Sequence, residues 1–249
     1  MNKSFALWIA VGLAWGLPPS LGATSTEDAG KEYDAAIQLT PNVENGRRVY
    51  LTCAVCHRPE GWGTPDGTYP QIAGQLPTVI IKQLADIRAR NRDNPIMFPF
   101  AIPSILGGTQ DMADVAAYIS SLPMSPVNGT GLGRDLALGE RVYAEKCADC
   151  HGKQGEGNAK EHIPAIWGQH YQYLARQFEW IKIGKRRNAD PEMQKQIQYF
   201  SGHEIRAVLD YVSRLAPAAE RRAPNPNWQN PDFPNYARPP QPMDLPATF

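Results

Sequence analysis

The chain has no excess of charge of either sign, few cysteines and little apolar sequence in long runs. Its 25 basic side chains balance 25 acidic ones, which argues against a protein that binds nucleic acid or an anionic membrane surface. Beyond residue 23 no segment stays apolar over the roughly 20 residues that span a bilayer. None alternates apolar and polar side chains as a half-buried strand does. The 249 residues are instead enough for two helical domains of roughly 100 residues each.

The first 23 residues have the composition of an export signal. Lys3 gives a positive start, residues 5–17 are apolar, and residues 21–23 resemble a small-residue cleavage site. An uncleaved anchor is the alternative, but the apolar stretch is shorter than a bilayer span. No cysteine follows this region to carry a lipid. We therefore expect cleavage near Ala23 and a periplasmic location.

All four cysteines fall in two copies of Cys-x-x-Cys-His, the attachment motif of c-type haem. The copies are Cys53-Ala54-Val55-Cys56-His57 and Cys147-Ala148-Asp149-Cys150-His151. On a helical turn the two thiols of each copy lie on one side, where they form thioethers with the porphyrin vinyl groups. The histidine that follows directs its imidazole to the iron. The motifs therefore predict two covalently bound haem c groups.

A zinc site, a thioredoxin-like dithiol and two disulfides are the alternatives for these cysteines. Zinc ribbons place their cysteine pairs roughly 15 to 20 residues apart, whereas these pairs lie much farther apart in the chain. A redox dithiol is expected within a βαβ unit, and neither kind of site requires histidine directly after each pair. If all four cysteines hold haem, none is left to form a disulfide.

The two motifs belong to an internal repeat. At an offset of 94 residues the aligned pairs are Pro70 with Pro164, Gly74 with Gly168, Gln75 with Gln169, and Gln83 with Gln177. A duplication of this length indicates two domains. We place the N-terminal domain at residues 24–126, the C-terminal domain at 127–216, and a proline-rich tail at 217–249.

Each half shows helical periodicity from end to end. A short helix is expected before each motif and a closing helix at residues 111–122 and 204–215, the second opening on a capping-box pattern. Gly46 and Gly139 occupy the same repeat position within the first helices, although the first copy is one residue shorter before its first cysteine. A tolerated surface glycine is one interpretation. We favour a close helix crossing near Tyr118 and Tyr211.

The second axial ligand of each iron decides between electron transfer and chemistry on a small molecule. Met97 and Met193 lie at matching distances after the two haem histidines, allowing for a two-residue insertion, and each follows a basic loop. A lone methionine is usually core filler, but the repetition favours axial ligation. Met112 has no counterpart and is expected to pack in a closing helix. Met124 and Met243 fall in the linker and the tail.

The other histidines, His162, His170 and His203, do not recur between the halves, so we expect each to be exposed or to cap a helix rather than to bind iron. Pro70 and Pro164 each lie thirteen residues after a haem histidine. A carbonyl at such a position accepts the imidazole N–H and orients the ring. The alternative for both prolines is that they only mark a turn in a loop.

These features together resemble the dihaem cytochrome c4 family. The resemblance rests on the twin haem motifs, the Pro-x-Ile-x-Gly-Gln segments at 70–75 and 164–169, the late Met97 and Met193, and the closing helices, and covers about residues 40 to 216. It implies two all-α, tandem class I cytochrome c domains related by a pseudo-twofold axis, with His/Met-ligated haems. The chain departs from the pattern at Arg58, where the second copy has Gly152, and in its C-terminal extension.

The resemblance also implies a function. Members of the family deliver electrons between periplasmic donors and acceptors such as a terminal oxidase, and similar domains serve as electron-accepting subunits of sulfide and thiosulfate dehydrogenases. We therefore expect an electron-transfer protein without substrate chemistry, whose partners are periplasmic redox proteins and not nucleic acid, with peripheral contact to a membrane-bound oxidase. The alternatives are such a sulfur-oxidoreductase subunit, or a haem enzyme with one open iron, in which Met97 or Met193 is not a ligand.

The linker and the tail affect how partners approach. The linker around residues 126–131 is short, which favours packed domains. The first half carries a small acidic excess and the second a small basic one, a difference that would orient a partner but that unselected surfaces also show. From Pro217 the tail holds nine prolines, with Trp228, Phe233 and Tyr236 among them. It is either disordered or, because disordered segments have few aromatics, an arm laid over its own domains or a partner.

Overall fold

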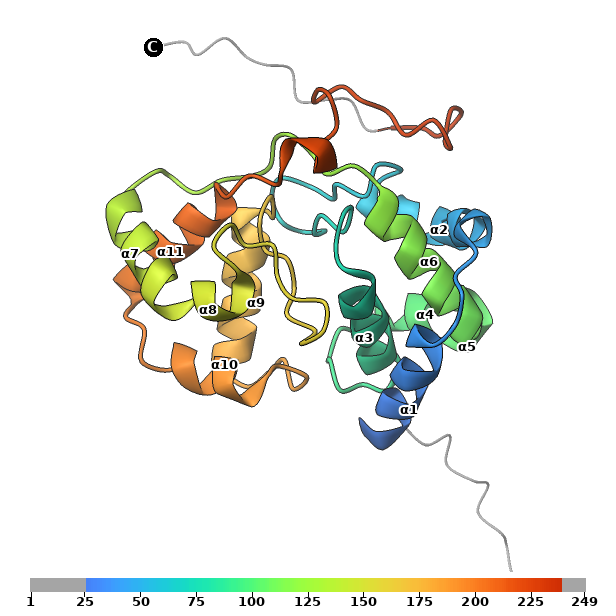
Figure 1. Cartoon of the computed structure of the whole chain (residues 1–249), viewed down its shortest axis with the longest axis horizontal. Helices are drawn as coiled ribbons and strands as arrows, with labels where there is room; N and C mark the ends of the chain where they lie inside the picture. The colour runs from blue at the N-terminus through green and yellow to red at the C-terminus, as the bar shows by residue number, and fades with distance from the viewer. Residues whose placement is uncertain (1–25, 239–249) are drawn as a thin grey trace, which may run out of the picture.

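The computed structural model describes residues 26–238, so the predicted export signal and Met243 lie outside it. Within these residues the chain forms helices and no strand, arranged as two helical lobes side by side (Figure 1). The N-terminal lobe contains α1 (Thr26–Ile37), α2 (Val43–His57), α3 (Pro77–Arg88), α4 (Phe98–Ala101), α5 (Pro103–Leu106) and α6 (Thr109–Ser121). The C-terminal lobe contains α7 (Leu136–Lys146), α8 (Ala148–His151), α9 (Tyr171–Lys182), α10 (Pro191–Ile197) and α11 (Gly202–Ser213). The all-α, two-domain prediction is confirmed.

Both lobes are built on a crossing of the helix that leads into the haem motif with the closing helix, α2 with α6 and α7 with α11. A Cβ atom added to Gly46 would lie 2.1 Å from the carbonyl oxygen of Asp114, and one added to Gly139 would lie 2.2 Å from that of Ala207. Only glycine allows the backbones to approach so closely. The predicted helix crossings are present, and the Tyr118 and Tyr211 side chains lie directly against the two glycines.

Two local features show how the sequence sets the helix ends. At the start of α11 the Ser201 hydroxyl accepts the Glu204 N–H at 3.2 Å and the Glu204 carboxylate accepts the Ser201 N–H at 2.9 Å, which confirms the capping box. α2 runs unbroken through the first haem motif, whereas the second helix breaks at Cys147 into α7 and α8. The break accommodates the extra residue between Gly139 and the second motif.

α1 precedes the first helix that the sequence predicts. Its apolar face is made mainly of small side chains, of which Ala29 and Ala36 are buried in the core of the N-terminal lobe and Tyr33 packs against it. Arg88 of α3 forms an ion pair with Glu32 of α1 and also donates to the carbonyl of Ala101 at 2.6 Å. These tertiary contacts hold the helix in place.

The two lobes are joined by glutamines related by the repeat. The side chain of Gln75 donates to Ala165 O at 2.9 Å and accepts from Ala165 N at 3.0 Å. Gln169 in turn donates to Gln71 O at 2.8 Å and accepts from Gln71 N at 3.1 Å. Because Gln71 and Ala165 are also equivalent in the repeat, this is the reciprocal arrangement of a twofold interface. The domains are packed together, as the short linker predicted.

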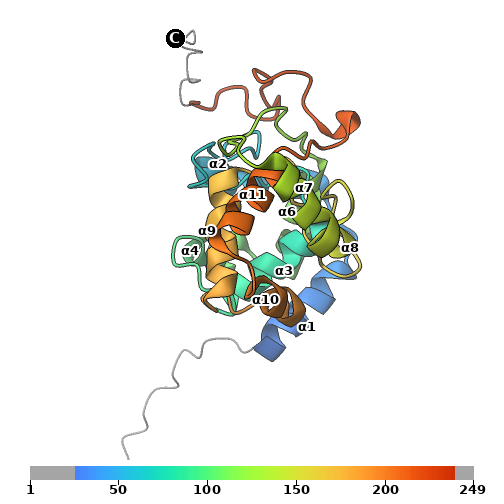
Figure 2. The same ribbon diagram turned by 90° about the vertical axis from the view of Figure 1, so that its left-hand side faces the viewer.

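Residues 217–238, which we call the C-terminal strap, leave the end of α11 and run along one side of the N-terminal lobe (Figures 1 and 2). The strap first pairs with the linker, where Met124 N donates to Arg221 O and Ala223 N donates to Met124 O, both at 2.8 Å. It then crosses the N-terminal lobe, where Asn230 and Phe233 become buried. Of the two interpretations of the tail, these residues follow the arm laid over its own domains. None of the helices within residues 26–238 is long and apolar enough to cross a membrane.

Candidate haem sites

Each haem motif lies at the end of a helix that faces the interior. Cys53, Cys56 and His57 occupy the last turn of α2, and Cys147, Cys150 and His151 span α8 and its N-cap. His57 and His151 are 6% and 9% exposed, so both imidazoles are turned into the protein. Both spacings bring the two thiols and the imidazole to the same side of a helical turn.

A hydrogen bond orients each of the two histidines. The Nδ1 atom of His57 lies 3.0 Å from the carbonyl oxygen of Pro70, and that of His151 lies 3.1 Å from the carbonyl oxygen of Pro164. A carbonyl only accepts, so Nδ1 carries the proton in both rings and Nε2 keeps its lone pair. Burial also lowers the pKa of both imidazoles, which favours the neutral form that binds metal. Each ring is therefore prepared as a ligand through Nε2.

Both motifs open onto one connected cavity of about 1280 Å³ between and within the lobes. Most of its wall is apolar, including Val79, Leu84 and Phe178. Met97 and Met193 line the same cavity. Met97 caps the short helix α4, and Met193 lies in the first turn of α10. Met112 is fully buried in the core of the N-terminal lobe, as expected of a packing residue, and does not line the cavity.

The environment of the cysteines is unlike that of a redox dithiol. All four are unpaired with one another. Burial raises the pKa of Cys53 and of Cys147 to about 12. Reactive dithiols depend on a lowered thiol pKa, so this arrangement does not support thioredoxin-like chemistry. It fits thiols whose role is to be bonded to a large apolar group in the cavity.

Two arginines from the basic loops before Met97 and Met193 meet inside the cavity, and neither was predicted as a site residue from the sequence. Arg92 donates to the amide oxygens of Gln83 and Gln177 at 2.9 and 3.2 Å, and Arg186 donates to the same two oxygens at 3.1 Å each. Arg92 also donates to Tyr173 at 3.0 Å. The two arginines and the two glutamines are each repeat partners at the offset of 94 residues, the signal that identifies them in retrospect.

This cluster carries more positive charge than its own acceptors neutralise. Loss of hydration and the neighbouring charge of Arg92 lower the pKa of Arg186 to about 9. Burial would raise the pKa of Tyr173, but the charges of Arg92 and Arg186 lower it. Two guanidinium groups held together in an apolar cavity favour a ligand that carries carboxylates. A porphyrin with propionate groups has that chemistry, so the residues present fit a haem in each half.

Of the remaining histidines, His162 is half-buried and lines the same cavity, whereas His170 and His203 do not line it. His203 is exposed and pairs with Asp135 at 2.9 Å, and His162 contacts Tyr33. His170 is the N-cap residue of α9, as one of the two expectations allows, but its side chain makes no capping hydrogen bond and it is not exposed. It is 2% exposed, and its Nε2 lies 2.7 Å from Trp62 O while its Nδ1 accepts the Gly129 N–H at 3.0 Å. His170 therefore connects the linker, through Gly129, to the N-terminal lobe, through Trp62. These contacts explain its burial, and they are evident only in the three-dimensional structure.

The fold and the paired motifs define a protein with two tandem c-type haem domains. The family model for cytochrome c matches residues 43–123 and 136–216. The chain belongs to the cytochrome c family and, within it, to the dihaem cytochromes c4. It is 30% identical to the cytochrome c4 of Azotobacter vinelandii over 68% of this chain and 87% of that one.

Two further relatives extend the comparison. The thiosulfate dehydrogenase electron acceptor of Stutzerimonas stutzeri is 29% identical, over 72% of this chain and 90% of its own length. The crystal structure of reduced recombinant cytochrome c4 from Pseudomonas stutzeri superposes with a TM-score of 0.63 and 27% identity, covering 71% of this chain and 100% of that one. This protein is a dihaem electron-transfer cytochrome.

Proposed function

We propose that each half of this chain holds one haem c between a histidine and a methionine, with His57 and Met97 in the first half and His151 and Met193 in the second. Cys53 and Cys56, and Cys147 and Cys150, supply the thioether bonds. The observation that carries the proposal is that both motifs and both methionines line one apolar cavity. Haem iron with two axial protein ligands exchanges one electron at a time and has no open position for a substrate.

The surrounding residues perform distinct tasks in this proposal. Pro70 and Pro164 accept the Nδ1–H of the haem histidines, which fixes each ring and increases its basicity as a ligand. Arg92 and Arg186 bind the haem carboxylates where the lobes meet. The glutamine pairs that join the lobes set the distance between the two sites, so that an electron received at one passes to the other within the molecule.

We further propose that the protein works in the periplasm between a donor dehydrogenase and an acceptor oxidase or reductase, with peripheral contact to a membrane-bound oxidase. The export-signal composition of residues 1–23 supports the location. The electron-acceptor name of the Stutzerimonas stutzeri relative supports a dehydrogenase of sulfur compounds as one class of donor. In that case the chain is the electron-accepting partner or subunit of the dehydrogenase.

The axial ligands are tested by near-infrared spectra of the ferric full-length protein and its Met97→Ala and Met193→Ala variants. Two His/Met haems predict a methionine-to-iron charge-transfer band that falls by about half in either variant and disappears in the double variant. Met112→Ala is the control and should keep the full band. A high-spin haem in the wild-type protein, or a band unaffected by one of the two substitutions, would overturn the assignment for that half.

A further inference from the structure

The residue directly after the first haem histidine has a backbone conformation that suits glycine. Arg58 has φ 68° and ψ 158°. At the same position of the repeat Gly152 has φ 81° and ψ 161°. Side chains with a Cβ atom rarely adopt this region, and they persist there only where surrounding contacts impose it. The first half therefore needs contacts that the second half does not need.

Part of the support is common to both halves. The Tyr50 hydroxyl donates to Arg58 O at 2.8 Å, and its counterpart Tyr143 donates to Gly152 O at 2.5 Å. In the second half Gly152 also closes the helix end itself, because its N–H donates to Ala148 O at 2.9 Å. In the first half the equivalent carbonyl is that of Ala54, and it accepts a hydrogen bond from the Tyr236 hydroxyl of the C-terminal strap.

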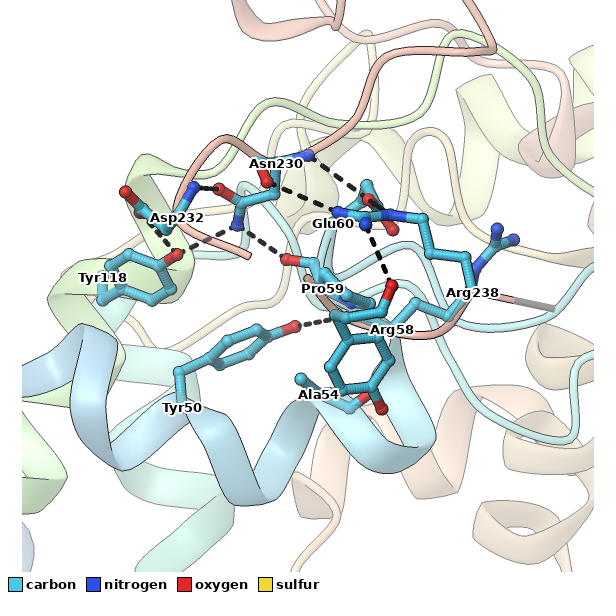
Figure 3. A network of polar contacts seen from close by, with 10 residues as sticks. Tyr50, Ala54, Arg58, Pro59, Glu60, Tyr118, Asn230, Asp232 and Arg238 are labelled. Atoms are coloured by element: carbon cyan, nitrogen blue, oxygen red, sulfur yellow. Dashed lines mark hydrogen bonds and ion pairs between the residues drawn. The ribbon is translucent and has the colours of Figure 1, made fainter. Parts of the chain in front are cut away.

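The strap holds the chain on both sides of His57 and Arg58. The Tyr236 hydroxyl donates to Ala54 O at 3.0 Å, two residues before Cys56. The side-chain amide of Asn230 donates to Pro59 O at 2.7 Å and to the Tyr118 hydroxyl at 2.9 Å (Figure 3). Asn230 is 2% exposed, so these bonds are shielded from water. The haem histidine thus lies between two backbone carbonyls that the strap binds.

An ion pair fixes the end of this arrangement. Glu60 is 1% exposed, and Arg238 of the strap lies 2.9 Å from its carboxylate. Asp232 adds a further contact by accepting the Tyr118 hydroxyl at 2.8 Å. At the repeat position of Glu60 the second half has Gln154, which is exposed. The buried carboxylate and its partner in the strap belong to the first half alone.

We propose that the C-terminal strap is a positioning element for the first haem: Tyr236, Asn230 and Arg238 hold the strained turn at Arg58, and through it His57, in the orientation that binds iron. The proposal rests on the proposed function, since it takes His57 as the axial ligand. The turn after the haem histidine is then held differently in the two halves. The second carries its own glycine turn, whereas the first depends on a segment that lies outside the cytochrome c family match.

Hydrogen exchange in the full-length holoprotein tests the proposal at two matched pairs of amides. Gly61 N donates to Arg58 O and Gly63 N to His57 O in the first half, and Gly155 N and Gly157 N make the equivalent bonds in the second. Tyr236→Phe and Asn230→Ala should each accelerate exchange at Gly61 and Gly63 roughly fivefold or more, and leave Gly155 and Gly157 unchanged. Gln229→Ala, at the exposed neighbour of Asn230, is the control.

A rescue variant tests the same proposal from the other side. Arg58→Gly in the Tyr236→Phe background should restore slow exchange at Gly61 and Gly63.

Reduction potentials distinguish a strap that positions the first haem from one that only stabilises the fold, because only the first kind changes the potential of one haem alone. We expect Tyr236→Phe and Asn230→Ala to lower the potential of the first haem, because a looser turn admits water, and to leave that of the second unchanged. The proposal is overturned if amide exchange accelerates equally in both halves or in neither. It is also overturned if Arg58→Gly does not restore slow exchange, or if the potential of the first haem stays unchanged. A wild-type protein without the methionine charge-transfer band overturns the proposed ligands instead, and the exchange ratio between Gly63 and Gly157 still decides about the strap.

Discussion

At the scale of single residues, the functional differences between the halves arise where the repeat diverges. Arg92 and Arg186 are equivalent, and both turn into the shared cavity. Glu60 and Gln154 are not equivalent in charge, and only Glu60 is buried. A buried carboxylate needs a partner because removing an ion from water costs several kcal/mol. The strap supplies that partner as Arg238. The difference between Glu60 and Gln154 in the repeat therefore explains why a positive charge at position 238 is needed.

The ion pair between Glu60 and Arg238 gives a prediction of stability. Arg238→Ala leaves the Glu60 carboxylate buried and uncompensated, and should reduce the free energy of unfolding by about 3 to 5 kcal/mol. Denaturant unfolding of the full-length protein measures the loss. Adding Glu60→Gln removes the charge and should recover most of it. If the double variant is no more stable than Arg238→Ala alone, the buried charge is not the cause.

At the scale of the elements, each haem motif is held by the crossing of the helix that leads into it with the closing helix of the same lobe. The crossing of α2 with α6 and that of α7 with α11 bring a helix backbone against a glycine, and the motif follows directly in the same or the next helix. The apolar periodicity of these helices continues to the histidine. The position of each imidazole therefore depends on how closely the two helices approach.

Alanine substitutions at helical glycines test this packing. Gly46→Ala and Gly139→Ala each place a methyl group against backbone oxygens that cannot move aside, and should cost about 1 to 3 kcal/mol or more. Gly30→Ala in α1 is the matched control, because nothing lies within 4 Å of its added Cβ. It should be neutral or stabilise by about 1 kcal/mol. Thermal unfolding followed by circular dichroism compares the three, and similar melting temperatures would contradict the close crossing.

The elements that the sequence predicts are those whose signals are local or repeated. The closing helices, the capping box at Ser201 and the glycine crossings follow from residues near one another in the chain or from their repeat partners. α1 was not predicted because its apolar face consists mainly of alanine, and contacts such as that between Arg88 and Glu32 fix the helix in place. Burial of His170 depends likewise on Trp62, far away in the chain.

The same distinction applies to the candidate sites. The hydrogen bonds from His57 to Pro70 and from His151 to Pro164 are those that the spacing predicts. The convergence of Arg92 and Arg186 could not be inferred, because a sequence does not show that two equivalent loops meet across an interface. The contacts between the strap and the residues around the first haem histidine join positions that are more than 100 residues apart, and no local pattern encodes them.

At the scale of the whole molecule, the two halves form one unit. The reciprocal bonds of Gln75 and Gln169 attach each lobe to the residue that follows the other lobe's proline, Ala165 and Gln71 respectively. Since those prolines bind the haem histidines, a displacement of one lobe would disturb both ligand environments. The strap adds a third connection through Met124 of the linker. This hydrogen-bonded pairing suits an electron that crosses from one haem to the other without a domain movement.

The central claim is that this molecule carries two closed haem sites and stores one electron in each. Reductive titration of the purified ferric full-length protein under carbon monoxide, followed by visible absorption, tests it most directly. The account predicts that each chain takes up two electrons and that neither ferrous haem binds carbon monoxide, because a methionine occupies the sixth position. Formation of a carbon monoxide adduct at one haem of the native protein would contradict the account and identify that iron as an open, enzyme-like site.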